Sequence, residues 1–79
     1  MYINVTIDLN KYDQKPMELR LSDHYSVKSL VDIVWQTRKI KKMPREGYWV
    51  KNLSKNKMST GNMTLKDSNI TTGDRIKIL

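Results

Sequence analysis

His24 is the only histidine of the chain and the side chain best suited to acid–base or metal chemistry, and Asp23 directly precedes it. An imidazole beside a carboxylate can act as a general base, and it can also bind zinc. Catalysis further requires a nucleophile within reach, and a zinc site requires additional ligands. The sequence shows neither, and it contains no cysteine. We therefore expect His24 to be a loop residue before a helix, and the protein to be no enzyme and to hold neither metal nor cofactor.

A run of cations is the second group with chemical capacity, and it comprises Arg38, Lys39, Lys41, Lys42 and Arg45. Phosphate or carboxylate groups could bind there through charge-assisted hydrogen bonds. The alternative is a solvated helix end, whose cations complement the negative end of the helix dipole. We favour the helix-end interpretation and retain the run as a candidate basic patch.

The whole chain is basic, with 15 Lys and Arg against 8 Asp and Glu and a formal net charge of +7. This balance favours an acidic partner, which could be nucleic acid, anionic lipid or an acidic protein face. Proteins that bind single-stranded nucleic acid interleave aromatic side chains with their cations, whereas the tyrosines here are scattered along the chain. A basic nucleic-acid-binding regulator is therefore the alternative hypothesis, and nucleic acid is not the expected partner.

The length of 79 residues predicts one domain over residues 1–79 with a small core. The N-terminus has no pattern of a signal peptide. The longest apolar stretch, residues 33–35, is far shorter than the roughly 20 residues that span a bilayer. We expect a soluble protein without a transmembrane segment, located in the cytoplasm.

Two hydrophobic periods predict the first half of the fold. Residues 2–9 alternate between apolar and polar, as do residues 17–21, so they predict an antiparallel pair of strands with one buried face. The period then changes to that of a helix over residues 27–39, and Ser26 is placed to cap it.

The second half of the chain predicts shorter elements. Residues 48–53 favour a third strand, and a short strand follows at Met58. Residues 64–70 predict a helical turn with Leu65 and Ile70 facing inward, and Ile76 and Ile78 of a last strand over residues 75–79 face the core. The result is an α+β fold with one helix packed across a mixed sheet of four to five strands. Periodicity does not tell where the last strand pairs.

The run Leu65-Lys66-Asp67-Ser68-Asn69-Ile70 before the final strand resembles the Leu-Ser-Asp-Tyr-Asn-Ile segment of ubiquitin. The order of elements is similar over the whole chain, which implies the β-grasp, ubiquitin-like fold. Ser68 stands where ubiquitin has a buried tyrosine whose hydroxyl helps to pin the loop. We therefore expect a different hydrogen-bond arrangement around Ser68.

A closer resemblance is to the ubiquitin-like YukD and EsaB family of Gram-positive type VII secretion loci. The matching segments are Met1-Tyr2-Ile3, Leu19-Arg20-Leu21-Ser22, Pro44-Arg45-Glu46-Gly47 with Trp49, and Ile70-Thr71 before Gly73-Asp74-Arg75. The resemblance implies a cytoplasmic accessory component that supports export of small helical substrates. The implied partner is a protein, a cytosolic part of a membrane-embedded secretion machine, with recruitment to the inner face of the cell membrane.

The likeness to ubiquitin also implies a docking face at Val50, Lys77 and Leu79. If Trp49, Ile76 and Ile78 point to the core, strand parity places these three side chains and that of Tyr48 on the open face of the sheet. A shift of one residue would reverse this, with Val50 in the core and Trp49 exposed.

Covalent attachment in ubiquitin and in related sulfur carriers requires a C-terminal Gly-Gly, and this sequence has no glycine after Gly73. We therefore expect a protein-interaction module that is not conjugated to its targets.

Overall fold

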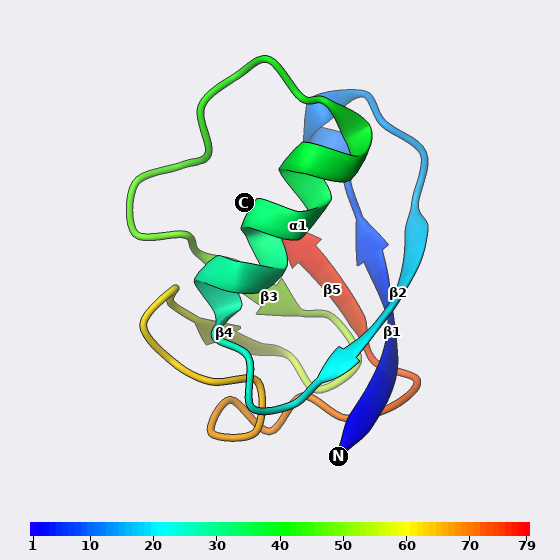
Figure 1. Ribbon diagram of the computed structural model, residues 1–79, viewed down its shortest axis with the longest axis vertical. Coiled ribbons are helices and arrows are strands. Elements are labelled where there is room, and N and C mark those ends of the chain that lie inside the picture. The colour runs from blue at the N-terminus through cyan, green and yellow to red at the C-terminus, as the bar shows by residue number, and fades with distance from the viewer.

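The fold is a mixed β-sheet with one α-helix lying across one of its faces (Figure 1). The computed structural model describes the whole chain, residues 1–79. Its elements in chain order are β1 (Tyr2–Asp8), the short 3-10 helix η1 (Asn10–Tyr12), β2 (Met17–Ser22), α1 (Val27–Arg38), β3 (Val50–Asn52), β4 (Lys57–Ser59) and β5 (Arg75–Ile78). The predicted α+β fold with one helix on a mixed sheet is confirmed, and the sheet has five strands.

The last strand lies at the centre of the sheet, whose order is β2-β1-β5-β3-β4. β5 pairs in parallel with β1 and antiparallel with β3, while the β1–β2 and β3–β4 pairs are antiparallel. Ile76 stands in register with Ile7 on one side, and Ile78 stands in register with Val50 on the other. The first and last strands therefore join the two hairpins into one sheet.

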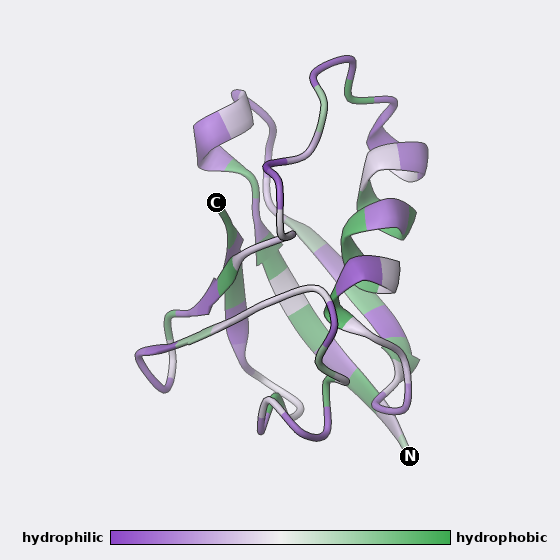
Figure 2. Ribbon diagram, turned by 90° about the vertical axis from the view of Figure 1, so that its left-hand side faces the viewer, coloured by the Kyte–Doolittle hydropathy of each residue, from purple (hydrophilic) through white to green (hydrophobic).

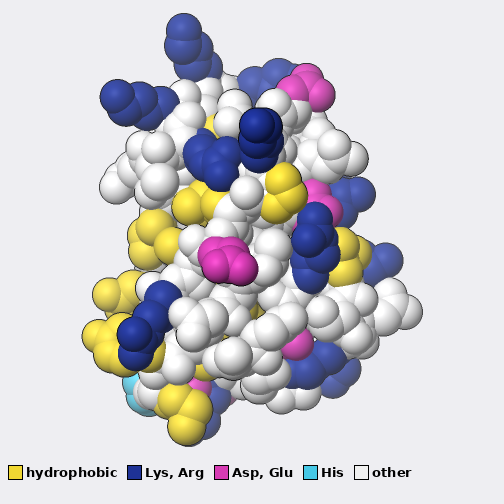
Figure 3. Space-filling model, turned by 90° about the vertical axis from the view of Figure 1, so that its right-hand side faces the viewer, with side chains coloured by type: hydrophobic (Ala, Val, Ile, Leu, Met, Phe, Trp, Pro, Cys, Tyr) yellow, Lys and Arg dark blue, Asp and Glu magenta, His cyan; other side chains and the backbone are white.

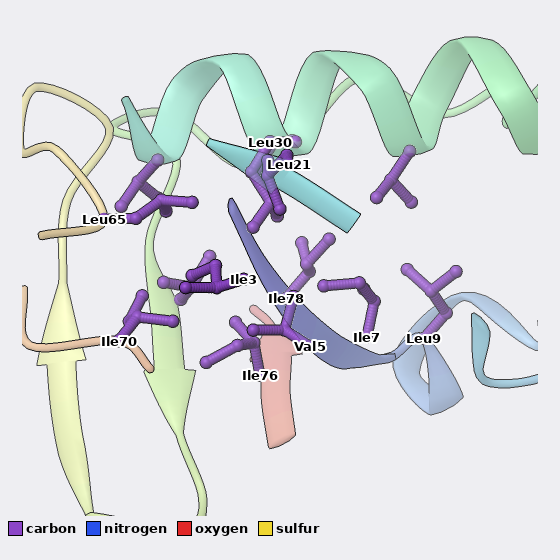
Figure 4. Packing of buried hydrophobic residues seen from close by; sticks show 14 residues of the cluster. Ile3, Val5, Ile7, Leu9, Leu21, Leu30, Leu65, Ile70, Ile76 and Ile78 are labelled. Carbon is purple, nitrogen blue, oxygen red and sulfur yellow. The ribbon is translucent and has the colours of Figure 1, made fainter. Parts of the chain in front are cut away.

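The hydrophobic core lies between α1 and the facing side of the sheet, and the other side carries no α-helix (Figure 2). Alternate residues of β1 and β5 point into this layer, together with Leu30 of α1 and with Leu65 and Ile70 from the loop before β5 (Figure 4). Each of these side chains is at least 97% buried, as the alternation and the helical spacing predicted. Burying such a side chain contributes roughly 1.5–3 kcal/mol.

The ends of α1 follow from local chemistry. Ser26 caps the helix as predicted, since its Oγ accepts a hydrogen bond of 3.0 Å from the backbone N–H of Ser29. At the other end Lys39 adopts the left-handed conformation with φ 51°, and its N–H donates to the Trp35 carbonyl. The helix therefore ends at Arg38.

The third strand differs from its prediction at both ends, and its register is the reverse of the expected one. Tyr48 has φ +53°, which interrupts extended backbone, so β3 begins at Val50. Val50 is only 1% exposed, whereas Trp49 is 37% exposed. The expectation that Trp49 faces the core and Val50 the open face is therefore wrong, and the shifted register is the observed one.

The loop before β5 is held mostly by backbone hydrogen bonds. The N–H of Ile70 donates to the Leu65 carbonyl, and the N–H of Ser68 donates to the Thr64 carbonyl, each with a donor–acceptor distance of 3.0 Å. The Ser68 hydroxyl is buried and has no hydrogen-bond partner. Lys55 reaches in from the β3–β4 turn and donates to the Asn69 carbonyl over 2.6 Å. The Lys55 ammonium, which lies outside the segment 65–70, thus forms a hydrogen bond with this loop.

Candidate functional site

His24 and Asp23 have different hydrogen-bond partners. His24 is exposed in the loop between β2 and α1, and its backbone N–H donates to the Ser22 hydroxyl. Asp23 accepts a hydrogen bond of 3.2 Å from the N-terminal ammonium of Met1. No group of three or more potential metal ligands occurs in the structure. The imidazole therefore lies on the surface, outside any cluster of potential metal ligands.

The open face of the sheet carries a row of side chains that crosses four strands. Register places Met58 opposite Lys51, Lys51 opposite Lys77, and Lys77 beside Asp8. Because directly paired residues point to the same side, these four share the face away from α1. Met58 at the β4 edge is 53% exposed. The centre of the open face thus consists of two lysines between an apolar and an acidic side chain.

Lys51 and Lys77 are among the many cations of the protein that take part in no ion pair. Lys55 bonds the buried Asp74 over 2.9 Å, and Arg75 bonds Asp8 over 3.3 Å. None of the four ion pairs includes Lys51 or Lys77. Opposed like charges on neighbouring strands repel one another, at a cost of roughly 0.2–1 kcal/mol. The pair therefore places two positive charges side by side at the centre of the open face, with Asp8 as the neighbouring acidic residue.

The four residues predicted for this face have different positions. Val50 belongs to the core, because its register with Ile78 places it on the α1 side. Tyr48 also lies on that side, half-buried, with the Lys28 ammonium 5.2 Å from its ring centroid. Lys77 stands on the open face, and Leu79 is half-buried after β5. Their predicted role in binding a partner remains a prediction.

Lys51 is the open-face residue that sequence reasoning missed. It follows Val50, so the reversed register exchanges the two side chains between the faces. The run 48–53 contains apolar side chains at both parities and does not indicate which parity is buried. The polar pair Lys51 and Asn52 gave no clear signal either, because Asn52 is buried and bonds Asp74 over 2.8 Å.

The predicted basic patch lies at the end of the molecule where α1 stops and η1 begins. Dark-blue Lys and Arg side chains gather at that end in Figure 3 and outnumber the magenta acidic ones on this side. Three of the predicted residues, Lys39, Lys41 and Lys42, line a recess of about 310 Å³ together with Lys11. Arg38 turns aside and donates to the Pro16 carbonyl over 3.3 Å. Tertiary structure thus adds Lys11 to the predicted group.

Two aromatic rings pack between this basic end and the hydrophobic core. Tyr12 and Trp35 meet edge to face with ring centroids 4.9 Å apart, and both pack against the core. The Tyr12 hydroxyl donates to the Leu79 carbonyl over 2.9 Å, and the Trp35 indole N–H donates to the Lys42 carbonyl over 2.8 Å. Burial raises the pKa of the Tyr12 hydroxyl, and the charge of Arg45 partly offsets this. Both rings are therefore structural supports of the basic end.

Sequence comparison assigns the chain to a family. A family model described as "WXG100 protein secretion system (Wss), protein YukD" matches residues 2–78. The chain belongs to the YukD family. It is 46% identical over 79 residues to the ESX secretion system protein YukD of Bacillus subtilis (strain 168), with all of both chains covered. The YukD resemblance drawn from the sequence motifs is thereby confirmed.

Comparison with solved structures confirms the ubiquitin-like fold of this YukD-family chain. Caldiarchaeum subterraneum ubiquitin superposes with a TM-score of 0.75 at 17% identity, covering 99% of this chain and 91% of that one. A de novo design based on ubiquitin gives a TM-score of 0.76 at 14% identity, with 99% and 87% covered. The ubiquitin-like domain of tubulin-binding cofactor B gives 0.70 at 18% identity, with 96% and 86% covered. These identities are too low to transfer more than the fold.

Neither the length nor the hydropathy of any helix in the structure suffices for a membrane crossing.

Proposed function

We propose that this YukD-family chain is a protein-interaction module that acts in the cytoplasm as an accessory component of the type VII secretion system. It binds an acidic surface on a component of the secretion machinery through the open face of its sheet. The observation that carries this proposal is the opposed, unpaired pair Lys51 and Lys77 at the centre of that face.

An acidic partner would change the electrostatic energy of the Lys51–Lys77 pair. A carboxylate placed between the two ammonium groups would remove their mutual repulsion and would form charge-assisted hydrogen bonds with both. The exposed Met58 beside Lys51 offers apolar area for contact, and Leu79 lies half-buried beyond Lys77. Acidic side chains flanked by apolar ones are therefore the complementary surface.

A non-covalent mode of action is part of the same proposal. Gly73, with φ +92°, lies in the turn before β5, where a left-handed backbone favours glycine. The proposed interaction uses side chains of β3, β4 and β5 and requires no activated carboxylate. The intact mass of the protein recovered from cells tests this point, since conjugation would add a second polypeptide to it.

The docking face is tested with two double variants that change the net charge equally, Lys51→Glu/Lys77→Glu and Lys41→Glu/Lys42→Glu. Each tagged protein is incubated with detergent-solubilised membranes of cells that contain the secretion system, and recovered proteins are identified by mass spectrometry. We expect the wild type and the Lys41/Lys42 variant to recover a secretion-machine component. Recovery by the Lys51/Lys77 variant should fall at least about tenfold, as for loss of a charged contact.

A loss of binding through charge reversal has to be distinguished from a loss through unfolding. The Lys51/Lys77 variant replaces one like-charged pair by another and also places a carboxylate beside Asp8, so we expect only a small loss of stability. Circular dichroism checks this before the binding experiment. Equal recovery of the machine component by all three proteins would eliminate the open face as the docking surface.

A further inference from the structure

We propose that the basic end of the molecule binds directly to an anionic lipid bilayer. In this arrangement Lys11, Lys39, Lys41 and Lys42 contact lipid phosphates, and the side chain of Met43 enters the interfacial layer. The surface differs from the open face proposed to bind protein, and the inference does not depend on that proposal.

The lysines of the basic end come from two distant segments. Lys11 belongs to η1, whereas Lys39, Lys41 and Lys42 follow α1, and all four line the same recess. Asp13 is the only acidic residue in its lining, and none of the four lysines takes part in an ion pair. A recess of about 310 Å³ is large enough for a phosphate group with part of its glycerol. The site is therefore shaped and charged for an anionic headgroup.

The backbone that carries these lysines is held in place. Trp35 anchors it at two points, since its indole N–H donates to the Lys42 carbonyl and its own carbonyl accepts from Ile40 over 3.2 Å. Tyr12 packs edge-on against the Trp35 ring and fixes η1 opposite the end of α1. A fixed array loses less conformational entropy on binding than a flexible basic tail would.

Met43 adds an exposed apolar side chain to the loop that follows α1. It is 86% exposed, more than any other large hydrophobic side chain of the protein. It lies in the loop between α1 and β3, which forms the top of the molecule in Figure 1, and Lys42 and Arg45 are close to it in sequence. An exposed apolar side chain that neighbours cations in the sequence is typical of proteins that bind the interface of anionic membranes.

These features favour lipid over nucleic acid as the acidic ligand. Single-stranded nucleic acid is bound by aromatic faces on which bases stack. Here Tyr12 meets Trp35 edge-on, both rings pack against the core, and the polar atoms of both donate to backbone carbonyls. The Met43 side chain contributes nothing to phosphate binding in water, whereas its burial among acyl chains is favourable in free energy.

Vesicle sedimentation tests the inference. The full chain is mixed with vesicles of phosphatidylcholine alone, or with vesicles in which half of the lipid is phosphatidylglycerol, at low ionic strength. We expect sedimentation with the anionic vesicles only, and release at about 1 M NaCl, where the Debye length falls to about 3 Å. Lys41→Glu/Lys42→Glu should weaken binding roughly 30-fold or more, because each lysine near an anionic surface contributes about fivefold.

Two further variants make the result specific. Met43→Ser should weaken binding to anionic vesicles by about tenfold without changing its salt dependence, since it removes apolar contact alone. Lys51→Glu/Lys77→Glu, with the same change of net charge as the Lys41/Lys42 variant, should retain most of the binding. No sedimentation of the wild type with anionic vesicles, or an equal loss in both double variants, would overturn the inference. The outcome is independent of the protein recovery from detergent, where no bilayer is present.

Discussion

Asp74 is a buried carboxylate, 6% exposed, directly before the central strand β5. It accepts hydrogen bonds from the Asn52 side chain, the backbone N–H of Thr71 and the Lys55 ammonium. Burial by itself would raise the pKa of this carboxyl, but these bonds and the charge of Lys55 outweigh it and hold the pKa below its ordinary value of 3.8. One residue thus connects β3, the following turn and β5.

The first prediction concerns acid stability. Because the pKa of Asp74 is lower in the folded state, its contribution to stability is complete above the unfolded pKa and decreases as the pH falls below about 3.8. Urea unfolding between neutral pH and about pH 3 should show the free energy of unfolding falling at the acid end. Asp74→Asn should lose about 2–4 kcal/mol at neutral pH and show a smaller acid-dependent fall. An unchanged pH profile in this variant would contradict the assignment.

At the scale of elements, β3 shows how strand pairing decides which face of the sheet a side chain joins. Tyr48 in the left-handed conformation ends the loop, and the pairing of Val50 with both Ile78 and Ser59 fixes the strand that follows. Since the side-chain period of a strand is two, Lys51 must then share the open face with Lys77. The candidate docking face depends on this register.

The second prediction tests that register. Val50→Asp places a carboxylate in the core and should cost at least about 4 kcal/mol, a large part of the roughly 4–12 kcal/mol expected for a chain of this length. Lys51→Asp should change the free energy of unfolding by no more than about 1 kcal/mol, since its side chain is on the open face. Guanidinium unfolding of both variants measures this. A greater loss for Lys51→Asp than for Val50→Asp would require the opposite register.

At the scale of the whole molecule, some cations take part in ion pairs within the fold, and others do not. The four ion pairs engage Lys28, Lys55, Arg75 and the N-terminal ammonium. The lysines of the open face and of the basic recess remain outside these pairs, and the net charge is +7. A net charge of this size repels itself in the compact state. We attribute part of this repulsion to the lysines of the two proposed binding surfaces.

The third prediction concerns salt. Raising NaCl from about 0.01 M to about 0.15 M shortens the Debye length from about 30 Å to about 8 Å, so it should stabilise the protein by screening the repulsion. We expect a gain of about 1 kcal/mol, or roughly 4–8 °C in Tm. The variant Lys51→Gln/Lys77→Gln should have a higher Tm than the wild type at low salt. Its Tm should rise less when NaCl is added. A Tm that falls with added salt in the wild type would show that the ion pairs outweigh the repulsion.

Much of the fold could be predicted because its signals are local. The alternation of Ile3, Val5 and Ile7 identified the buried face of β1, and Ser26 marked the start of α1. The motif from Leu65 to Ile70 identified the ubiquitin-like loop. Each of these rests on neighbours a few residues away, where chain connectivity already fixes which side chains share a face.

The candidate sites depended on contacts between distant segments. The sequence determined a basic α+β chain with a cation run after its helix, and through its motifs it determined the family. Only the tertiary structure placed Lys51 beside Lys77 and brought Lys11 to the cations after α1. The physical reason is that residues 48–53 carry apolar side chains at both parities, so their register is set by pairing with β5 and β4. Likewise, the position of η1 opposite the end of α1 depends on the packing of Tyr12 against Trp35, which no local pattern encodes.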